Sequence, residues 1–147
     1  MARKTLDASF ADGMKRRREV LGDAWVDKSI KTKTDFNAEF LDLITRYAWD
    51  DIWNRPGLDR KTRRMLVLAM TIGMGRWEEF ALHCRASLAE NDLTQDQVKE
   101  VLLQSAIYCG VPSANTAFKE AKAIIAELDA EKIVEKKKAP LKVAKKK

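Results

Sequence analysis

Residues 75–90, GRWEEFALHCRASLAE, place apolar side chains three or four positions apart and contain the only histidine of the chain. This spacing puts the apolar side chains on one face of an α-helix and the polar ones on the other. The stretch therefore predicts an amphipathic helix that packs against a helical core. Its apolar positions are Trp77, Phe80, Ala81, Cys84 and Leu88.

Glu79 and His83 lie four residues apart in this stretch. Because residues four apart share a helix face, the carboxylate can reach the imidazole, fix its tautomer and raise its pKa. A pair of this kind at the edge of an apolar surface suits proton transfer. Spacing alone favours a structural histidine beside a core stripe over a catalytic one, and both interpretations stay open at this point.

A strongly apolar stretch precedes the histidine. Residues 60–74, RKTRRMLVLAMTIGM, follow Asp59, a good helix N-cap. A helix that is apolar on all sides is buried in a core or at a subunit interface. Its first turn holds Arg63 and Arg64, where the helix dipole disfavours cations unless an anion is present. These two arginines are candidates for anion binding, and the alternative is an ion pair with acidic groups of the preceding helix.

Two more helices are predicted after the histidine. Thr94 and Gln97 match a capping box before an apolar stripe that ends at Gly110. Pro112 begins a sixth helix whose apolar residues keep a helical period and which can continue to about residue 138.

Three segments precede the apolar stretch. Residues 9–21 predict a first helix that Gly22 ends. Residues 26–34 have mixed polarity and no clear period, so they predict an irregular connection. Asp35 is an N-cap candidate for a helix that runs to about residue 53. This helix has an apolar stripe formed by Phe36, Phe40, Leu43, Ile44, Tyr47 and Ala48.

The helix after Asp35 ends in residues 46–57, RYAWDDIWNRPG, where Pro56 and Gly57 stop it. Aromatic and charged side chains gather before this break. Half-buried amphipathic side chains at a helix end explain the mixture without any function, whereas a substrate pocket uses the same residue types. The residues concerned are Arg46, Trp49, Asp50, Asp51, Trp53 and Arg55.

The patterns together predict an all-α fold of about six helices packed as antiparallel hairpins. Residues 1–130 form one predicted domain, since 147 residues with 46% hydrophobic composition suit a single core. The net charge of +6 comes from residues 131–147, which hold eight Lys and two Glu, so the remainder has 20 basic and 20 acidic residues. We expect this Lys-rich tail to be disordered at its end.

Several classes of protein do not fit the sequence. The neutral body lacks interleaved basic and aromatic residues, so no specific nucleic-acid partner is expected. The first 20 residues lack an apolar h-region, and residues 65–74 are too short to span a bilayer. Cys84 and Cys109 are not spaced for a metal cluster or a disulfide framework. We therefore expect a cytoplasmic protein without a membrane partner.

Three segments in this order and spacing closely resemble the carboxymuconolactone decarboxylase family, whose fold is alkylhydroperoxidase-like. They are ITRYAWDDIWNRPGLDRKTRRMLVLAM, EFALHCRASL and EVLLQSAIYCGVPSANTAF. The resemblance covers roughly residues 10–128. It implies an all-α homo-oligomer, commonly a hexamer, with no metal or organic cofactor. The implied activity is decarboxylation of 4-carboxymuconolactone to 3-oxoadipate enol-lactone in protocatechuate catabolism, the β-ketoadipate pathway.

Residue roles follow from this resemblance together with the chemistry. His83 is the expected proton donor, with Glu79 holding it or sharing the proton. Arg63 and Arg46 are expected to clamp the retained carboxylate. The substrate-binding set is completed by Trp49, Asp51 and Tyr108. Trp49 and Tyr108 are candidate donors to the lactone oxygen, while the role of Asp51 is open because family members often have Glu at this position.

Two alternatives remain at this stage. Some members of the wider superfamily use a CxxC before the equivalent histidine for thiol redox chemistry. Here Glu79 stands four residues before His83 and Cys84 follows it. This difference weighs against a thiol-dependent antioxidant. The other alternative is a member of the decarboxylase family that acts on a different lactone.

Overall fold

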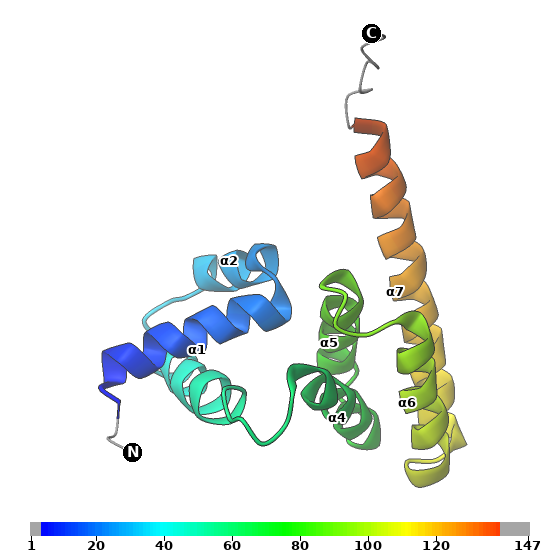
Figure 1. The fold of residues 1–147 in the computed structure, drawn as a ribbon, viewed down its shortest axis with the longest axis horizontal. Helices are drawn as coiled ribbons and strands as arrows, with labels where there is room; N and C mark the ends of the chain where they lie inside the picture. The colour runs from blue at the N-terminus through cyan, green and yellow to red at the C-terminus, as the bar shows by residue number, and fades with distance from the viewer. Residues whose placement is uncertain (1–3, 139–147) are drawn as a thin grey trace, which may run out of the picture.

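The computed structural model describes residues 4–138, and these form helices without any β-strand. The predicted all-α fold class is therefore confirmed. Figure 1 shows α1, α2 and the segment before α4 on one side, and α4 to α7 on the other. The elements are α1 Leu6–Leu21, α2 Asp23–Lys31, α3 Ala38–Ile44, the π-helix η1 Thr45–Ile52, α4 Arg60–Gly73, α5 Trp77–Ala89, α6 Gln95–Tyr108 and α7 Val111–Lys138.

Two apolar clusters hold these helices together. The larger cluster lies between α4, α5, α6 and α7, and Leu68, Phe80 and Leu102 are among its fully buried members. The smaller cluster joins α1, α2 and η1 to α5, where Ala86 packs with Val20 and other residues. Helix α5 contributes to both clusters, so the histidine lies on the element that connects the two parts of the molecule.

Helix α1 packs very closely against η1. A Cβ atom on Gly13 would lie 2.0 Å from the carbonyl oxygen of Thr45, so only glycine allows this approach. In η1 the amide of Trp53 donates to the carbonyl of Ala48, five residues earlier, at 3.0 Å. Short π-helical segments of this kind are frequent at functional sites.

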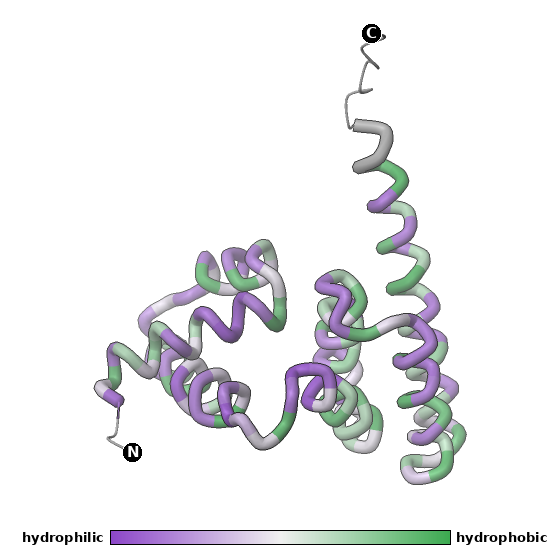
Figure 2. Tube along the Cα trace, viewed as in Figure 1, coloured by the Kyte–Doolittle hydropathy of each residue, from purple (hydrophilic) through white to green (hydrophobic). Residues whose placement is uncertain are grey.

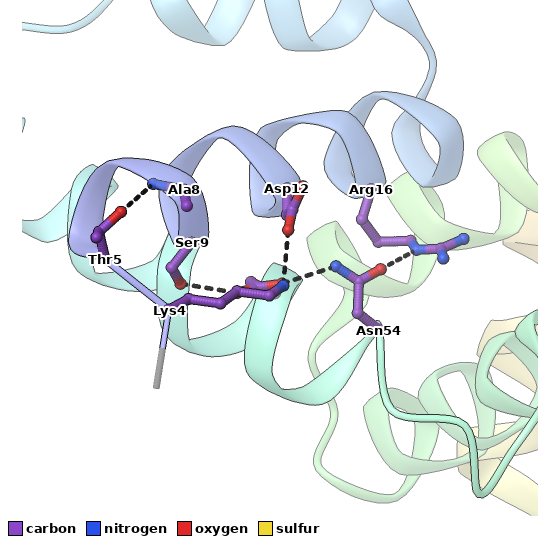
Figure 3. Close-up of polar contacts among 8 residues, drawn as sticks. Lys4, Thr5, Ala8, Ser9, Asp12, Arg16 and Asn54 are labelled. Carbon is purple, nitrogen blue, oxygen red and sulfur yellow. Dashed lines mark hydrogen bonds and ion pairs between the residues drawn. The ribbon is translucent and has the colours of Figure 1, made fainter. Parts of the chain in front are cut away.

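A buried carboxylate fixes α1 against η1. Asp50 is only 4% exposed and accepts hydrogen bonds from Lys4 at 2.8 Å, Ser9 at 2.8 Å and Asn54 at 2.9 Å. Burial alone would raise the pKa of Asp50, but these bonds together lower the pKa below its usual value. Figure 3 shows how Arg16 extends the network by donating to Asn54.

Several predicted helix boundaries agree with the structure. Asp59 caps α4 by accepting from the amide of Thr62, and the capping box of Thr94 and Gln97 begins α6. Helix α7 continues to Lys138. The prediction of a disordered tail lies outside the described residues beyond this point.

Two predictions about the N-terminal half were wrong. Residues 26–34 belong largely to α2, which shows no apolar stripe in the sequence because Val26 is its only fully buried residue. Asp35 does not cap a helix. Instead Asn37 accepts from the amide of Thr34 at 2.8 Å, residues 34–37 form a turn, and α3 begins at Ala38.

Helix α4 is apolar but only one of its faces is buried. Figure 2 shows hydrophilic and hydrophobic residues following one another along the helices of the fold. Leu68 and Ile72 of α4 are fully buried, whereas Leu66 and Met70 of α4 and Met74, which follows its last residue, are 40%, 57% and 66% exposed. The stripe formed by Leu66, Met70 and Met74, spaced four residues apart, is called the α4 stripe below.

Candidate active site

His83 lies against two stacked indole rings. Its imidazole is parallel to the ring of Trp53, with an interplanar angle of 3° and centroids 6.3 Å apart. Trp53 in turn stacks on Trp49, with centroids 5.4 Å apart. Trp53 follows η1 and His83 lies in α5, so the contact joins elements that are distant in the sequence. The predicted residues His83 and Trp49 are therefore brought together through Trp53.

The structure corrects the predicted effect on the histidine pKa. The pKa of His83 is lowered to about 4, chiefly by burial and also by the charge of Arg64, while the charge of Glu79 acts in the opposite direction. Glu79 is exposed and is not hydrogen-bonded to His83 within the described chain. The Nδ1 atom of His83 is buried without a partner among the described residues. His83 is thus a neutral imidazole near pH 7 in the free protein.

Arg64 is the buried cation whose charge lowers the pKa of His83. Its side chain is fully buried, and Nε and Nη2 donate to one carboxylate oxygen of Asp92 at 2.9 and 2.8 Å. Arg60 pairs with the other oxygen of Asp92 at 2.6 Å. The Nη1 atom of Arg64 is buried and unpartnered within the described residues. The expected alternative for Arg64, an ion pair with the preceding helix, is replaced by a pair with the loop after α5.

Arg63 supports the segment that carries the indole rings. Its Nη2 atom donates to the carbonyl oxygen of Arg55 at 2.9 Å, and its Nε atom is buried without a partner in the described part of the chain. Arg55 follows Trp53 by two residues, so Arg63 holds the chain next to the stacked rings. The Nη2 atom of Arg63 is thus occupied by a backbone contact, and its Nε atom remains available to donate to another acceptor.

Arg46 and Asp51 line a pocket that includes neither Trp49 nor Trp53. This open polar pocket has a volume of about 430 Å³ and is also lined by Asp50, Tyr47 and Arg55. The pocket does not include His83. The structure thus separates the predicted site residues into two groups. One is the His83 cluster, formed by His83, Trp53, Trp49 and Arg64, and the other is the Arg46 pocket.

Tyr108 is a largely exposed residue. It ends α6 and is 79% exposed. Its hydroxyl has no hydrogen bond to another described residue. Among residues 4–138, Tyr108 is not a lining residue of the Arg46 pocket and has no hydrogen bond or ring contact with His83 or the tryptophans beside it.

Comparison with known proteins identifies the relationship. The sequence pattern described as the Carboxymuconolactone decarboxylase family matches residues 38–123. A 4-carboxymuconolactone decarboxylase of Acinetobacter baylyi is 37% identical over 119 residues, which cover 81% of this chain and 88% of that protein. The chain belongs to the carboxymuconolactone decarboxylase family.

Two other relatives widen the picture within this family. A nitrosuccinic acid decarboxylase of Metarhizium robertsii is 41% identical over 104 residues, covering 71% of this chain and 72% of that protein. A 4-carboxymuconolactone decarboxylase of Pseudomonas putida is 54% identical over 39 residues, which are 26% of this chain and 81% of that sequence. These names support a carboxy-lyase, and the chain is a decarboxylase of the carboxymuconolactone decarboxylase family.

Cys84 does not resemble the reactive thiol of a redox centre. Cys84 is fully buried, and burial raises its pKa to about 12. A thiol in this environment has almost no thiolate at neutral pH, and the thiolate is the reactive form. Both cysteines are free rather than joined in a disulfide.

Sequence reasoning missed two contributors to the His83 cluster. Trp53 was seen only as one of several aromatic residues near a helix end, and Arg64 only as a possible anion ligand. The several arginines at the start of α4 were a sign that one of them acts on a nearby charged or titratable group. No periodicity could show that Trp53 turns towards α5, since that contact depends on the path of η1.

None of the helices within residues 4–138 combines the length and apolarity that a membrane-spanning segment requires.

Proposed function

We propose that this chain decarboxylates 4-carboxymuconolactone to 3-oxoadipate enol-lactone in protocatechuate catabolism through the β-ketoadipate pathway, with no metal or organic cofactor. The observation that carries the proposal is the state of His83. This half-buried imidazole lies parallel to the ring of Trp53 and is kept neutral by burial and by the charge of Arg64. The relatives named for this substrate support it. A cytoplasmic location, as expected from the sequence, forms part of the proposal.

The substrate can supply its own electron acceptor. Loss of carbon dioxide leaves an electron pair that the conjugated lactone carbonyl can take up as a dienolate. The protein then has three tasks, namely to position the substrate, to stabilise negative charge on the lactone oxygen and to deliver a proton to carbon. These are tasks for side chains such as arginine, indole and imidazole.

His83 is the proposed proton donor. Because its pKa is low, it must take up a proton when the substrate binds, before it can donate one. In the free protein the imidazole is neutral because it is buried and lies in the field of Arg64. A substrate carboxylate next to the ring would offset that field and favour the imidazolium form. His83 would then take up a proton as the substrate binds and pass it to the dienolate. Glu79, whose charge also favours protonation, would assist from the exposed side.

The anion contacts are divided between the two groups of residues described above. Arg63, whose Nε atom is unpartnered and whose Nη2 atom holds Arg55, is the proposed ligand of the retained carboxylate. Trp49 is the proposed donor to the lactone oxygen. Arg46 and Asp51 line the separate pocket, so we propose that they act on substrate entry or on a site that another subunit completes. Tyr108 requires a second subunit in the same way.

We also propose that residues 1–130 act as one domain that assembles into a homo-oligomer, a hexamer by family resemblance. The α4 stripe supports this, because its three large apolar side chains, spaced four residues apart, lie exposed. Met70→Glu should dissociate the oligomer in sedimentation analysis, while Ile133→Glu, an exposed apolar position on α7, should not. An unchanged sedimentation coefficient for Met70→Glu would place the interface on another surface.

A different substrate is a specific alternative, since one relative is named for nitrosuccinic acid. Both compounds are dicarboxylates with an electron-withdrawing group that can accept the electrons of the broken bond. The test is to measure kcat/KM for enzymatically generated 4-carboxymuconolactone and for nitrosuccinate with the same preparation. A higher value for the lactone is expected. A higher value for the nitro compound would transfer the proposal to that substrate, and no turnover of either would overturn it.

A further inference from the structure

A second cavity lies between α1, α2 and the α3–η1 segment, away from the residues around His83. Its volume is about 280 Å³. Phe10, Met14, Ile30 and Leu41 provide most of its apolar wall. It has no lining residue in common with the His83 cluster or the Arg46 pocket. A cavity of this size and character suits a small ligand with an apolar body.

One wall of this cavity is formed by a buried arginine without an anionic partner. Arg17 is only 4% exposed, and its Nη2 atom donates to the hydroxyl of Ser29 at 3.0 Å. Its Nε atom is buried and has no hydrogen-bond partner among the described residues. The guanidinium carbon lies 5.5 Å from the ring centroid of Trp25. Within residues 4–138, no carboxylate forms an ion pair with Arg17.

The charges near Arg17 do not compensate for its burial. Neighbouring Arg18 pairs with Asp27 and Asp23, both of which are therefore already engaged. Asp42 also lines the cavity but pairs with Lys33 at 3.2 Å. Burial and the charge of Arg18 both lower the pKa of Arg17, because both disfavour the charged guanidinium in this position. Buried charges are normally paired, so Arg17 lacks the partner that its position requires.

We propose that this cavity is a binding site for a small monocarboxylate with an apolar body, and that Arg17 is its carboxylate anchor. The carboxylate would accept from the free Nε atom and neutralise the buried charge. The apolar body would occupy the space beside Phe10, Met14 and Leu41. The proposal concerns binding alone and does not depend on the reaction at His83, so its test can fail or succeed whatever the substrate of the enzyme proves to be.

The test is isothermal titration calorimetry of the full chain with benzoate as the probe and benzamide as its neutral match. Benzoate should bind at one site per chain, and benzamide should bind at least about tenfold more weakly, since a charge-assisted contact is lost. Arg17→Met should weaken benzoate binding by a similar factor. Lys15→Met, which changes an exposed cation of the same helix, should leave it unchanged.

A second variant separates loss of the anchor from loss of the fold. Leu41→Phe keeps Arg17 but fills part of the cavity, and it should also weaken benzoate binding while circular dichroism shows a folded protein. Equal binding of benzoate and benzamide would contradict the proposal. So would undiminished benzoate binding to folded Arg17→Met or Leu41→Phe, or the absence of binding to the wild-type chain.

Discussion

The imidazole of His83 lies parallel to the indole of Trp53, with 3° between the planes and 6.3 Å between the ring centroids. This relationship ties the only histidine of the chain to the segment that follows a π-helix. Burial of the imidazole in this position disfavours its charged form. The charge of His83 therefore depends on this buried position and on Arg64.

His83 should titrate well below the usual histidine range. Its pKa is lowered to about 4 in the folded protein, whereas an unfolded histidine titrates near 6.5. Between these two pH values the unfolded chain binds more protons than the folded one. The free energy of unfolding should therefore fall as the pH is lowered from about 6.5 to 4, and it should not depend on this group above about pH 6.5. Nuclear magnetic resonance of the single imidazole measures this directly. A midpoint above 6 would show that the ring is not desolvated.

Replacing Arg64 should raise the pKa of His83. The guanidinium is one of two causes of the lowered value, so Arg64→Met removes its contribution and leaves burial. Arg60→Met is the matched control, because Arg60 binds the other oxygen of Asp92 without acting as a cause of the His83 shift. The same titration is the measurement. A His83 midpoint that does not move in folded Arg64→Met would remove this residue from the electrostatics of the site.

Arg63→Lys should lower kcat/KM by at least about tenfold, since lysine cannot reproduce the planar guanidinium that reaches both Arg55 and an acceptor at Nε. Lys61→Arg on the exposed side of the same turn is the control and should have little effect. Steady-state kinetics on the lactone give the comparison. Unchanged kcat and KM in Arg63→Lys would require a different carboxylate ligand.

Thiol chemistry should be dispensable. The pKa of Cys84 is raised to about 12 by burial, so its thiol is unreactive near neutrality. The double variant Cys84→Ala/Cys109→Ala should keep most of the decarboxylase activity and should differ little from wild type in peroxide consumption. Loss of a thiol-dependent peroxidase activity in the double variant would instead support the antioxidant alternative.

The all-α fold could be predicted because local signals and burial agree along most of the chain. Asp59 and the Thr94 capping box gave correct helix starts, and the apolar spacing gave α5. Helix α2 was missed because it buries only Val26 fully and so has no stripe. The π-helix was missed because the apolar spacing before residue 53 predicts one continuous helix and gives no sign of the hydrogen bond from Trp53 to Ala48.

The candidate site was predictable in its residues but not in its arrangement. The spacing of Glu79 and His83 placed them correctly on one helix, yet burial outweighs the carboxylate and reverses the expected pKa shift. Trp49 and Arg46 are three residues apart in η1, and they face different surroundings because Trp49 stacks on Trp53 while Arg46 lines an open pocket. Such separations depend on tertiary packing, which no local pattern contains.

The central claim is that His83 donates the proton in a decarboxylation. The most direct measurement is turnover of enzymatically generated 4-carboxymuconolactone, followed by lactone loss and carbon dioxide release, for the wild type and for His83→Asn. We expect the wild type to turn over and the folded variant to be slower by about 10²-fold or more, the scale of general acid catalysis. Equal turnover in a folded His83→Asn protein would contradict the claim and remove His83 from the reaction.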